Sequence, residues 1–416
     1  ILPELGEENI QEMSFDLFAY RKLQDTAADC EDRCDQIERE MRDPKAAERF
    51  ALKQSQAFVD QMEGFALELE DELMNFSDVS YKSFVKSESE IITLFYDKFA
   101  DIPLLSRMDA VAETFIDEIE TLLNRDLPEE ERIPLIEKFQ KMYETMDFYV
   151  LYNRFLKKEG YQTLPRRPLE KRKLRYEDVY PVLYLKYRLS RQAERSNIKH
   201  LVIDEMQDYS RLQYLIIRRM FSCKMTILGD RAQTMADQQQ DVLQFLPGIF
   251  GKDLRRIEMR KSYRNTVEIA SYAANLIGVT DLELFERHGM PVLERNVTDL
   301  EAALREAVDT LFPDEKTYET AAVIVPDEKT AERAYLILRE ILAEKDFDCE
   351  KRLSWLNRDS SSFKKGLTVT TFYLAKGLEF DQVFSIFPKD EKREIMMQAQ
   401  YIAATRALHE LRVYHI

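Results

Sequence analysis

Hydrophobic residues recur along the chain in two patterns, and the change between them falls near residue 176. From about residue 25 to residue 160, apolar positions return every three or four residues, the spacing of amphipathic helices. After residue 176, short apolar runs alternate with helical stretches, a pattern typical of parallel sheets with crossover helices. The first part is therefore predicted to be helical and the second α/β.

The helical part begins with a clear start signal at Asp43-Pro44, an N-cap followed by proline at the first helical position. The helix that follows should carry its apolar residues near one face, namely Phe50, Phe58, Met62, Phe65, Leu69 and Leu73. Similar patterns predict helices at 91–99, 110–123 and 133–155. Their acidic faces are most simply solvated, and no chemistry is recognisable in this part.

The α/β part should contain two parallel sheets, with a domain boundary around 250–262. Its predicted elements are a helix at 179–189, a strand ending at Asp204, a helix at 212–220, a strand at 225–228, a helix at 266–277, a strand at 321–325, a helix at 329–342, strands at 367–371 and 383–387, a helix at 396–408 and a strand at 411–414.

Composition places the chain among ordinary globular proteins. It has 416 residues, enough for two or three domains, and a net charge of −17, which argues against a surface that coats nucleic acid generally. Cys30 and Cys34 have no histidine or further cysteine nearby to complete a metal site, so a reduced pair is expected. No apolar stretch approaches 18 residues and no signal peptide is visible, which favours a cytoplasmic protein without a membrane partner.

One segment departs from the acidic balance. Residues 165–175, PRRPLEKRKLR, hold six basic residues against one acid. The stretch is either a solvated linker or an electropositive strip for phosphate or an acidic protein surface, and the residues alone do not decide between them.

Acids follow a predicted buried strand at Asp204 and Glu205. A carboxylate at such a strand end is costly unless it meets a cation, so Asp204 invites Mg²⁺. Phosphoryl transfer to water also needs a group that orients or deprotonates the water, and Glu205, predicted to point to the other side of an extended chain, suits that role. Acid pairs at strand ends often merely cap the next helix, so the pair alone is weak evidence.

The next predicted strand delivers Gly229, Asp230 and then Gln233. Glycine lets the backbone approach a ligand closely, and an uncharged amide such as that of Gln233 can contact a terminal phosphate. Two arginines further along, Arg264 in SYRNT and Arg406 in AATRAL, are candidates to reach the γ-phosphate from another domain.

The turn Lys376-Gly377 with Glu379 offers a flexible backbone and an acid that could accept a hydrogen bond from a ribose hydroxyl. Taken singly, such an arginine is more often a surface ion pair, and KGLEF is also a plain entry to a strand.

Five motifs follow one another in a fixed order: IDEMQD, LGDRAQ, SYRNT, TVTTFYLAKGLEF and YIAATRA. This series resembles motifs II to VI of superfamily 1 helicases of the UvrD, PcrA and Rep type and covers residues 198–416. The resemblance implies two RecA-like domains that clamp ATP and Mg²⁺ between them. It also implies that Asp204 binds Mg²⁺, Glu205 activates water, Gln207 and Gln233 sense the γ-phosphate, and Glu379 contacts the ribose. Gly229, Asp230, Lys376 and Gly377 would complete the nucleotide site, and Arg264 and Arg406 would approach from the second domain.

Within that superfamily, DEMQDYS, FERHGMP (285–291), FYLAKGLEFD and ATRALHEL look most like the HelD family of ATPases, which release bacterial RNA polymerase from nucleic acid. Tyr373 stands where UvrD-type translocases usually have histidine, and LPELGE (2–7) resembles a HelD segment that precedes a helical insertion. The domains expected on this basis are a remnant of the first motor domain (1–24), a helical insertion (25–175), the rest of the first domain (176–255) and a second RecA-like domain (256–416).

The phosphate cradle G-x-x-x-x-G-K-[ST] is absent from these 416 residues. The nearest imitation, Gly248 to Lys252, has its glycines three apart and Asp253 where serine or threonine must bind the metal. Because the chain begins with Ile1, we expect a fragment whose cradle lies upstream and which alone does not hydrolyse ATP. Three functions remain open for the longer parent protein. It is a polymerase-recycling ATPase, a UvrD-type DNA helicase or translocase, or a polymerase-binding protein whose shape nucleotide only adjusts.

Overall fold

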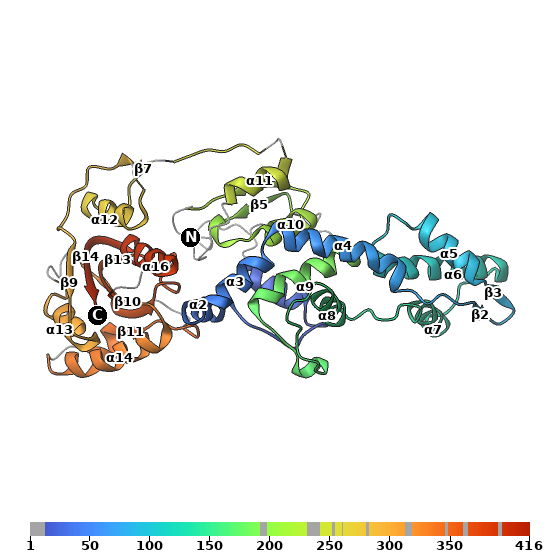
Figure 1. The fold of residues 1–416 in the computed structure, drawn as a ribbon, viewed down its shortest axis with the longest axis horizontal. Coiled ribbons are helices and arrows are strands. Elements are labelled where there is room, and N and C mark those ends of the chain that lie inside the picture. The colour runs from blue at the N-terminus through green and yellow to red at the C-terminus, as the bar shows by residue number, and fades with distance from the viewer. Residues whose placement is uncertain are drawn as a thin grey trace. The chain divides into compact units, whose positions relative to one another are not determined.

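The computed structural model describes residues 13–191, 198–230, 242–251, 254–259, 261–279, 283–312, 318–345, 348–360, 365–389 and 393–416 (Figure 1). The chain forms two compact units. The first comprises Ile1–Ile203, Tyr209–Thr226 and Phe245–Phe250, and the second comprises Asp204–Asp208, Ile227–Gln244 and Gly251–Ile416.

Helices dominate the first unit. They are α1 (Phe15–Lys22), α2 (Arg33–Arg42), α3 (Pro44–Lys53), α4 (Gln56–Glu72), α5 (Glu88–Thr93) with a π-helical continuation (Leu94–Lys98), α6 (Arg107–Leu123), α7 (Glu129–Gln140), α8 (Phe148–Lys158), α9 (Tyr176–Leu189) and α10 (Arg211–Met220). Helix α11 (Val242–Phe250) is divided between the two units. Short 3₁₀ turns lie at Leu104–Ser106, Leu169–Lys171 and Met206–Asp208.

Strands in this part of the chain are short. Strands β1 (Asp29–Cys30) and β4 (Lys173–Leu174) pair in parallel, β2 (Val79–Tyr81) and β3 (Phe84–Lys86) form an antiparallel hairpin, and β5 (His200–Ile203) pairs with β6 (Lys224–Ile227).

Two helices predicted as single elements are each interrupted by a side-chain cap. Ser55 ends the helix that begins at Asp43, because its hydroxyl accepts a hydrogen bond from the backbone N–H of Phe58 and starts α4. Asp147 likewise starts α8 by accepting hydrogen bonds from the backbone N–H groups of Tyr149 and Val150. A capping residue offers the backbone an alternative to the continuing helix, which apolar spacing alone does not reveal.

Helix α9 is the central element of the first unit. Most of its residues are buried, and it packs against α1, α2, α3, α4, α8 and α10. The predicted insertion (25–175) and α9 belong to the same compact unit, so no break between units marks residue 175.

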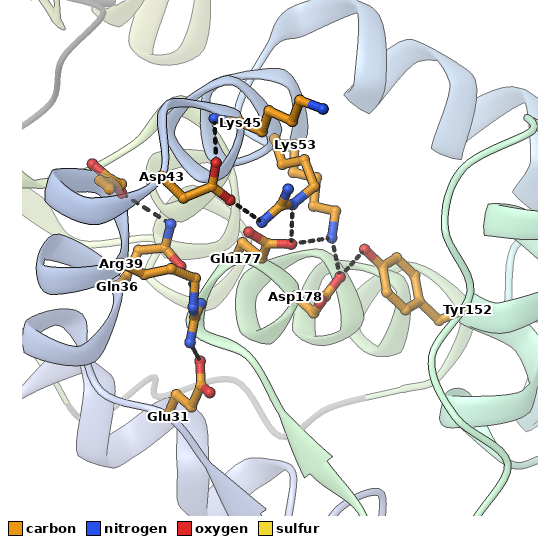
Figure 2. A network of polar contacts seen from close by, with 11 residues as sticks. Glu31, Gln36, Arg39, Asp43, Lys45, Lys53, Tyr152, Glu177 and Asp178 are labelled. Atoms are coloured by element: carbon orange, nitrogen blue, oxygen red, sulfur yellow. Dashed lines mark hydrogen bonds and ion pairs between the residues drawn. The ribbon is translucent and has the colours of Figure 1, made fainter.

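A buried ionic network fixes α3 and α8 to α9 (Figure 2). The Lys53 ammonium lies 3.0 Å from Glu177 Oε1 and 2.7 Å from Asp178 Oδ1. The Tyr152 hydroxyl donates a hydrogen bond of 2.7 Å to the same Asp178 oxygen. The side chains of Lys53, Glu177 and Asp178 are at most 9 % exposed, so they meet one another in place of water.

The second unit is built on a six-stranded sheet with the order β11-β12-β10-β13-β14-β9, and every pairing is parallel. Its strands are β9 (Leu293–Asn296), β10 (Thr320–Val325), β11 (Leu353–Trp355), β12 (Gly366–Thr371), β13 (Phe380–Phe387) and β14 (Ala407–His415), beside a separate pair, β7 (Lys261–Ser262) and β8 (Glu283–Leu284). The central strands are almost continuously buried, as expected for a parallel sheet covered on both faces.

Helices cover both faces of this sheet. They are α12 (Val267–Ile277), α13 (Leu300–Asp309), α14 (Glu328–Ala343), α15 (Cys349–Arg352) and α16 (Glu394–Thr405). Helices α13 and α14 lie on one side and α12 and α16 on the other (Figure 1). The predicted helix 396–408 ends earlier, because Arg406 O accepts a hydrogen bond from Phe380 N and strand pairing begins at Ala407. The parallel α/β character predicted for this region is confirmed.

Candidate functional site

The candidate site residues that the structure describes all lie in the second unit. The first group follows β5. Asp204 and Glu205 come directly after the strand, and Glu205 has a positive φ of 53°. The expectation of an extended chain at Glu205 was wrong. The chain turns here because Glu205 N donates to Asp204 Oδ1 at 2.8 Å and Asp208 N donates to Glu205 O at 2.9 Å, which closes a short turn.

Gln207 connects this turn to the end of β6. Its Nε2 donates to Glu205 Oε2 at 2.5 Å, and its Oε1 accepts from the backbone N–H of Asp230 at 3.0 Å. A Cβ at Gly229 would lie 2.4 Å from Gln207 Oε1, so glycine is required for this approach. Gly229 was predicted for access to a phosphate; in the structure it gives access to the Gln207 amide. Gln233 lies outside the described residues.

The loop after β12 carries the next group. Lys376 is 7 % exposed, and its Nζ lies 2.6 Å from Asp208 Oδ2 and 3.4 Å from Glu205 Oε2. The neighbouring Gly377 has a φ of 81°, a conformation that favours glycine. The lysine predicted to bind nucleotide therefore contacts two carboxylates of the acidic turn.

The two candidate arginines have different surroundings. Arg264 Nε forms an ion pair of 2.7 Å with Glu379 Oε1, and both side chains are partly exposed. Arg406 is buried, and its guanidinium donates to the carbonyl oxygens of Ile402 and Leu378, each at 3.3 Å.

Burial lowers the pKa of Arg406, and the nearby Arg264 guanidinium lowers that pKa further. The Glu205 and Glu379 carboxylates oppose this shift, so both acids lie within electrostatic reach of Arg406. The acidic turn and both arginines thus share one charged neighbourhood.

Three residues outside the predicted set belong to this neighbourhood. Asp208 holds Lys376, as described above. Asn265 Nδ2 donates to the carbonyl oxygens of Thr405 and Ala407, at 3.1 and 2.6 Å, and so ties the segment with Arg264 to the segment with Arg406. Burial raises the pKa of Tyr401, and the Asp230 carboxylate adds to the shift. The one sequence signal was adjacency, since Asp208, Asn265 and Tyr401 stand inside the motifs IDEMQD, SYRNT and YIAATRA.

Asp204 is the candidate ligand for a metal ion. Among the described residues, no group of three or more His, Cys, Asp or Glu side chains is placed to hold an ion by itself. The exposed Asp204 carboxylate is nevertheless suited to Mg²⁺ that arrives with nucleotide, since such an ion takes one or two protein carboxylates and completes its octahedron with phosphate oxygens and water.

The fold and the site together define a class. The second unit is a parallel α/β fold. A turn of acids and amides after β5 shares its electrostatic environment with two arginines. These are the groups that phosphoryl-transfer sites use.

The UvrD/REP helicase N-terminal domain matches residues 4–235, more than half of the chain. The chain belongs to the UvrD/Rep helicase family, and it is a helicase-like motor protein of superfamily 1. A search of curated protein sequences found no match.

Solved helicase structures are also similar to the chain. The C-terminal domain of a possible DNA helicase from Lactobacillus plantarum WCFS1 is 24 % identical with a TM-score of 0.29, over 37 % of this chain and 88 % of that domain. The PRRSV helicase is 14 % identical with a TM-score of 0.30, over 64 % of this chain and 45 % of the viral chain.

A complex of the arterivirus helicase, nonstructural protein 10, with DNA is 14 % identical with a TM-score of 0.28, over 64 % and 51 % of the two chains. This chain thus spans about half the length of the viral helicases that it matches.

Among the helices of the described residues, none is both long and apolar enough to cross a membrane.

Proposed function

We propose that this chain is the greater part of an ATP-driven, HelD-like motor that couples ATP hydrolysis to the release of RNA polymerase from nucleic acid. The observation that carries the proposal is the segment 376–379 of the second unit, which contacts Glu205 through Lys376, Arg406 through the Leu378 carbonyl oxygen and Arg264 through Glu379. A general base and two guanidinium groups in one place can activate water and neutralise the charge that develops on a transferring phosphoryl group.

In this proposal each candidate residue except Lys376, which contacts two carboxylates, keeps the role that the family resemblance implies. Asp204 holds Mg²⁺, which would neutralise charge on the phosphates of ATP, and Glu205 accepts the proton of the attacking water. Gln207 and Gln233 contact the γ-phosphate, Arg264 and Arg406 stabilise it, and Glu379 contacts the ribose. Gly229, Asp230 and Gly377 shape the backbone around the nucleotide.

The proposed domain organisation has two RecA-like domains, with a helical insertion over residues 25–175 in the first. The six-stranded parallel sheet of the second unit supports the second of these domains. Because the 416 residues contain no phosphate cradle, we propose that they do not hydrolyse ATP alone.

Tyr373 favours the polymerase-recycling function over DNA translocation. Its side chain is buried, 6 % exposed, and its ring packs edge-on against Phe372 at a centroid distance of 5.2 Å. A side chain packed in this way adds little to a surface for a nucleic-acid strand, whereas an exposed aromatic ring would offer a stacking platform.

Glu205→Gln tests the catalytic role directly. In the full-length protein this change removes the base but keeps the size of the side chain, so magnesium-dependent ATP turnover should fall by about 10² to 10⁴-fold. The control is Glu332→Gln, an exposed acid on α14, which should leave turnover unchanged. Undiminished hydrolysis in Glu205→Gln would reject the proposal.

Polymerase capture and strand unwinding separate the three functions. A polymerase-recycling ATPase binds core RNA polymerase, does not unwind duplex DNA, and loses polymerase release with Glu205→Gln. A UvrD-type helicase or translocase shows DNA-stimulated turnover and unwinding instead. If the Glu205→Gln variant binds polymerase and still releases it, the protein is mainly a polymerase-binding protein, and nucleotide only adjusts its shape.

A further inference from the structure

Lys376 makes its contacts with protein carboxylates. Its ammonium is 2.6 Å from Asp208 Oδ2 and 3.4 Å from Glu205 Oε2, and the side chain is 7 % exposed. A lysine that binds phosphate needs an accessible ammonium. The Lys376 ammonium is covered and already paired with two acids of the turn after β5.

Glu205 is in a conformation that needs support. A glutamate with a φ of 53° has an unfavourable backbone, and such residues persist where the surrounding contacts hold them. Its Oε2 receives the Gln207 amide at 2.5 Å on one side and lies near the Lys376 ammonium on the other. The side chain is still 37 % exposed, which leaves it open to water.

The loop that presents Lys376 also reaches both arginines. Arg406 donates to the carbonyl oxygen of Leu378, and Arg264 pairs with Glu379. Gly377, with its φ of 81°, stands between Lys376 and these contacts. One loop therefore connects the acidic turn to the groups that are to meet the γ-phosphate.

We propose that Lys376 is a positioning residue. It holds the carboxylates of Glu205 and Asp208 in place relative to the guanidinium groups of Arg264 and Arg406, and it does not itself contribute binding energy to ATP. This inference rests on the proposed function, since it assigns a role toward the water-activating Glu205. It replaces the sequence-based expectation that Lys376 binds the nucleotide.

The test is steady-state ATP hydrolysis by the full-length protein carrying Lys376→Met. Displacement of a catalytic group by about 1 Å can cost on the order of 10²-fold in rate, so kcat should fall by about 10 to 100-fold. Since the lysine does not bind ATP in this proposal, KM should stay within about threefold of its original value. The matched control is Lys345→Met, which removes a surface lysine paired with Asp309 in the same unit and should leave both constants unchanged.

Companion variants distinguish positioning from loss of structure. Lys376→Arg keeps a cation between the two acids and should recover most of kcat, whereas Lys376→Gln should not. Asp208→Asn should reduce kcat as well, and the double change Lys376→Met with Asp208→Asn should cost less than the sum of the two, because both remove one ion pair. The only tryptophan of the chain, Trp355 on β11, reports by its fluorescence whether each variant keeps the second unit folded.

Two outcomes overturn the inference while the proposed function stands. If KM rises and kcat is unchanged, Lys376 is a nucleotide-binding residue; if neither constant moves, its ion pairs are incidental to turnover. In both cases Glu205→Gln remains inactive. If Glu205→Gln is active, the proposed function itself fails, whatever Lys376 does.

Discussion

Two lysines in different units of the molecule each lie between a pair of carboxylates. Lys53 in the first unit is 3.0 and 2.7 Å from Glu177 and Asp178. Lys376 in the second unit is 3.4 and 2.6 Å from Glu205 and Asp208. The contacts are alike, but Glu177 and Asp178 are 2 and 1 % exposed, whereas Glu205 and Asp208 are 37 and 29 % exposed.

The exposure of the acids indicates what each cluster can do. Buried carboxylates cannot exchange a protein partner for water or ligand without a large cost, so the Lys53 cluster fixes helices in place. Half-exposed carboxylates can meet water, so the Lys376 cluster can take part in chemistry. The same pair of contacts thus stabilises packing in one unit and prepares a site in the other.

The largest expected effect on stability is that of Lys53→Met. It leaves Asp178 buried without a cation and leaves Glu177 only the longer contact with Arg49, at 3.6 Å. Breaking such a buried ion pair destabilises a protein by about 3 to 5 kcal/mol. Urea unfolding followed by far-UV circular dichroism monitors the helix-rich first unit, while Trp355 fluorescence monitors the second. Lys45→Met, an exposed lysine on the same helix α3 (Figure 2), is the control and should change stability by less than about 0.5 kcal/mol.

Lys376→Met completes this comparison. Its partners are partly exposed, so the loss of stability in the second unit should be about 1 kcal/mol or less. Equal losses from Lys53→Met and Lys376→Met would show that the exposure of the carboxylates does not separate the two clusters.

A pair of glycine variants compares the same two regions. Gly377 has a φ of 81° in the loop with Lys376, and alanine there should cost about 1 to 2 kcal/mol, although its Cβ would meet no atom within 4 Å. Gly64 lies inside α4, also in open space, and alanine there should stabilise the first unit by about 0.5 to 1 kcal/mol. Two changes of the same sign in thermal unfolding would contradict this contrast.

Sequence patterns predicted the central strands of the second unit, because these strands are short runs rich in apolar residues, but they did not predict the exposed strand β9 or the short strand β11. The strand expected at 321–325 is β10, and the helix expected at 266–277 is α12 with Thr266 as its N-cap. Arg264 and Arg406 both lie in the second unit, and their approach to the γ-phosphate stays a prediction.

What the sequence did not reveal depends on residues far apart in the chain. Lys53 stands 124 residues before Glu177, and no sequence pattern near either residue predicts that they form an ion pair. Lys376 stands 168 residues after Asp208, so its role toward the acidic turn appears only in the folded chain. The left-handed Glu205 is a local feature, yet a strand-like approach gives no sign of the turn that follows it.

The smallest effect concerns a third acid, Glu268, whose side chain is 25 % exposed, close to the values for Glu205 and Asp208. Glu268, in the first turn of α12, accepts hydrogen bonds from His288 Nδ1 and from the backbone N–H of Gly289, both at 2.9 Å. The His288 contact, followed by the Gly289 contact, lowers the pKa of Glu268 from 4.5 to about 2.

Because the folded pKa lies below the ordinary value, the contribution of Glu268 to stability is present above pH 4.5 and is lost as the pH falls toward 2. The difference in melting temperature between the wild type and Glu268→Gln should therefore shrink over this interval and stay constant above it. Carboxyl carbon NMR of Glu268 monitors the titration directly. A midpoint near 4.5 would mean that in solution these two hydrogen bonds give way to water, and that a partly exposed carboxylate does not keep its partners as Glu177 and Asp178 do.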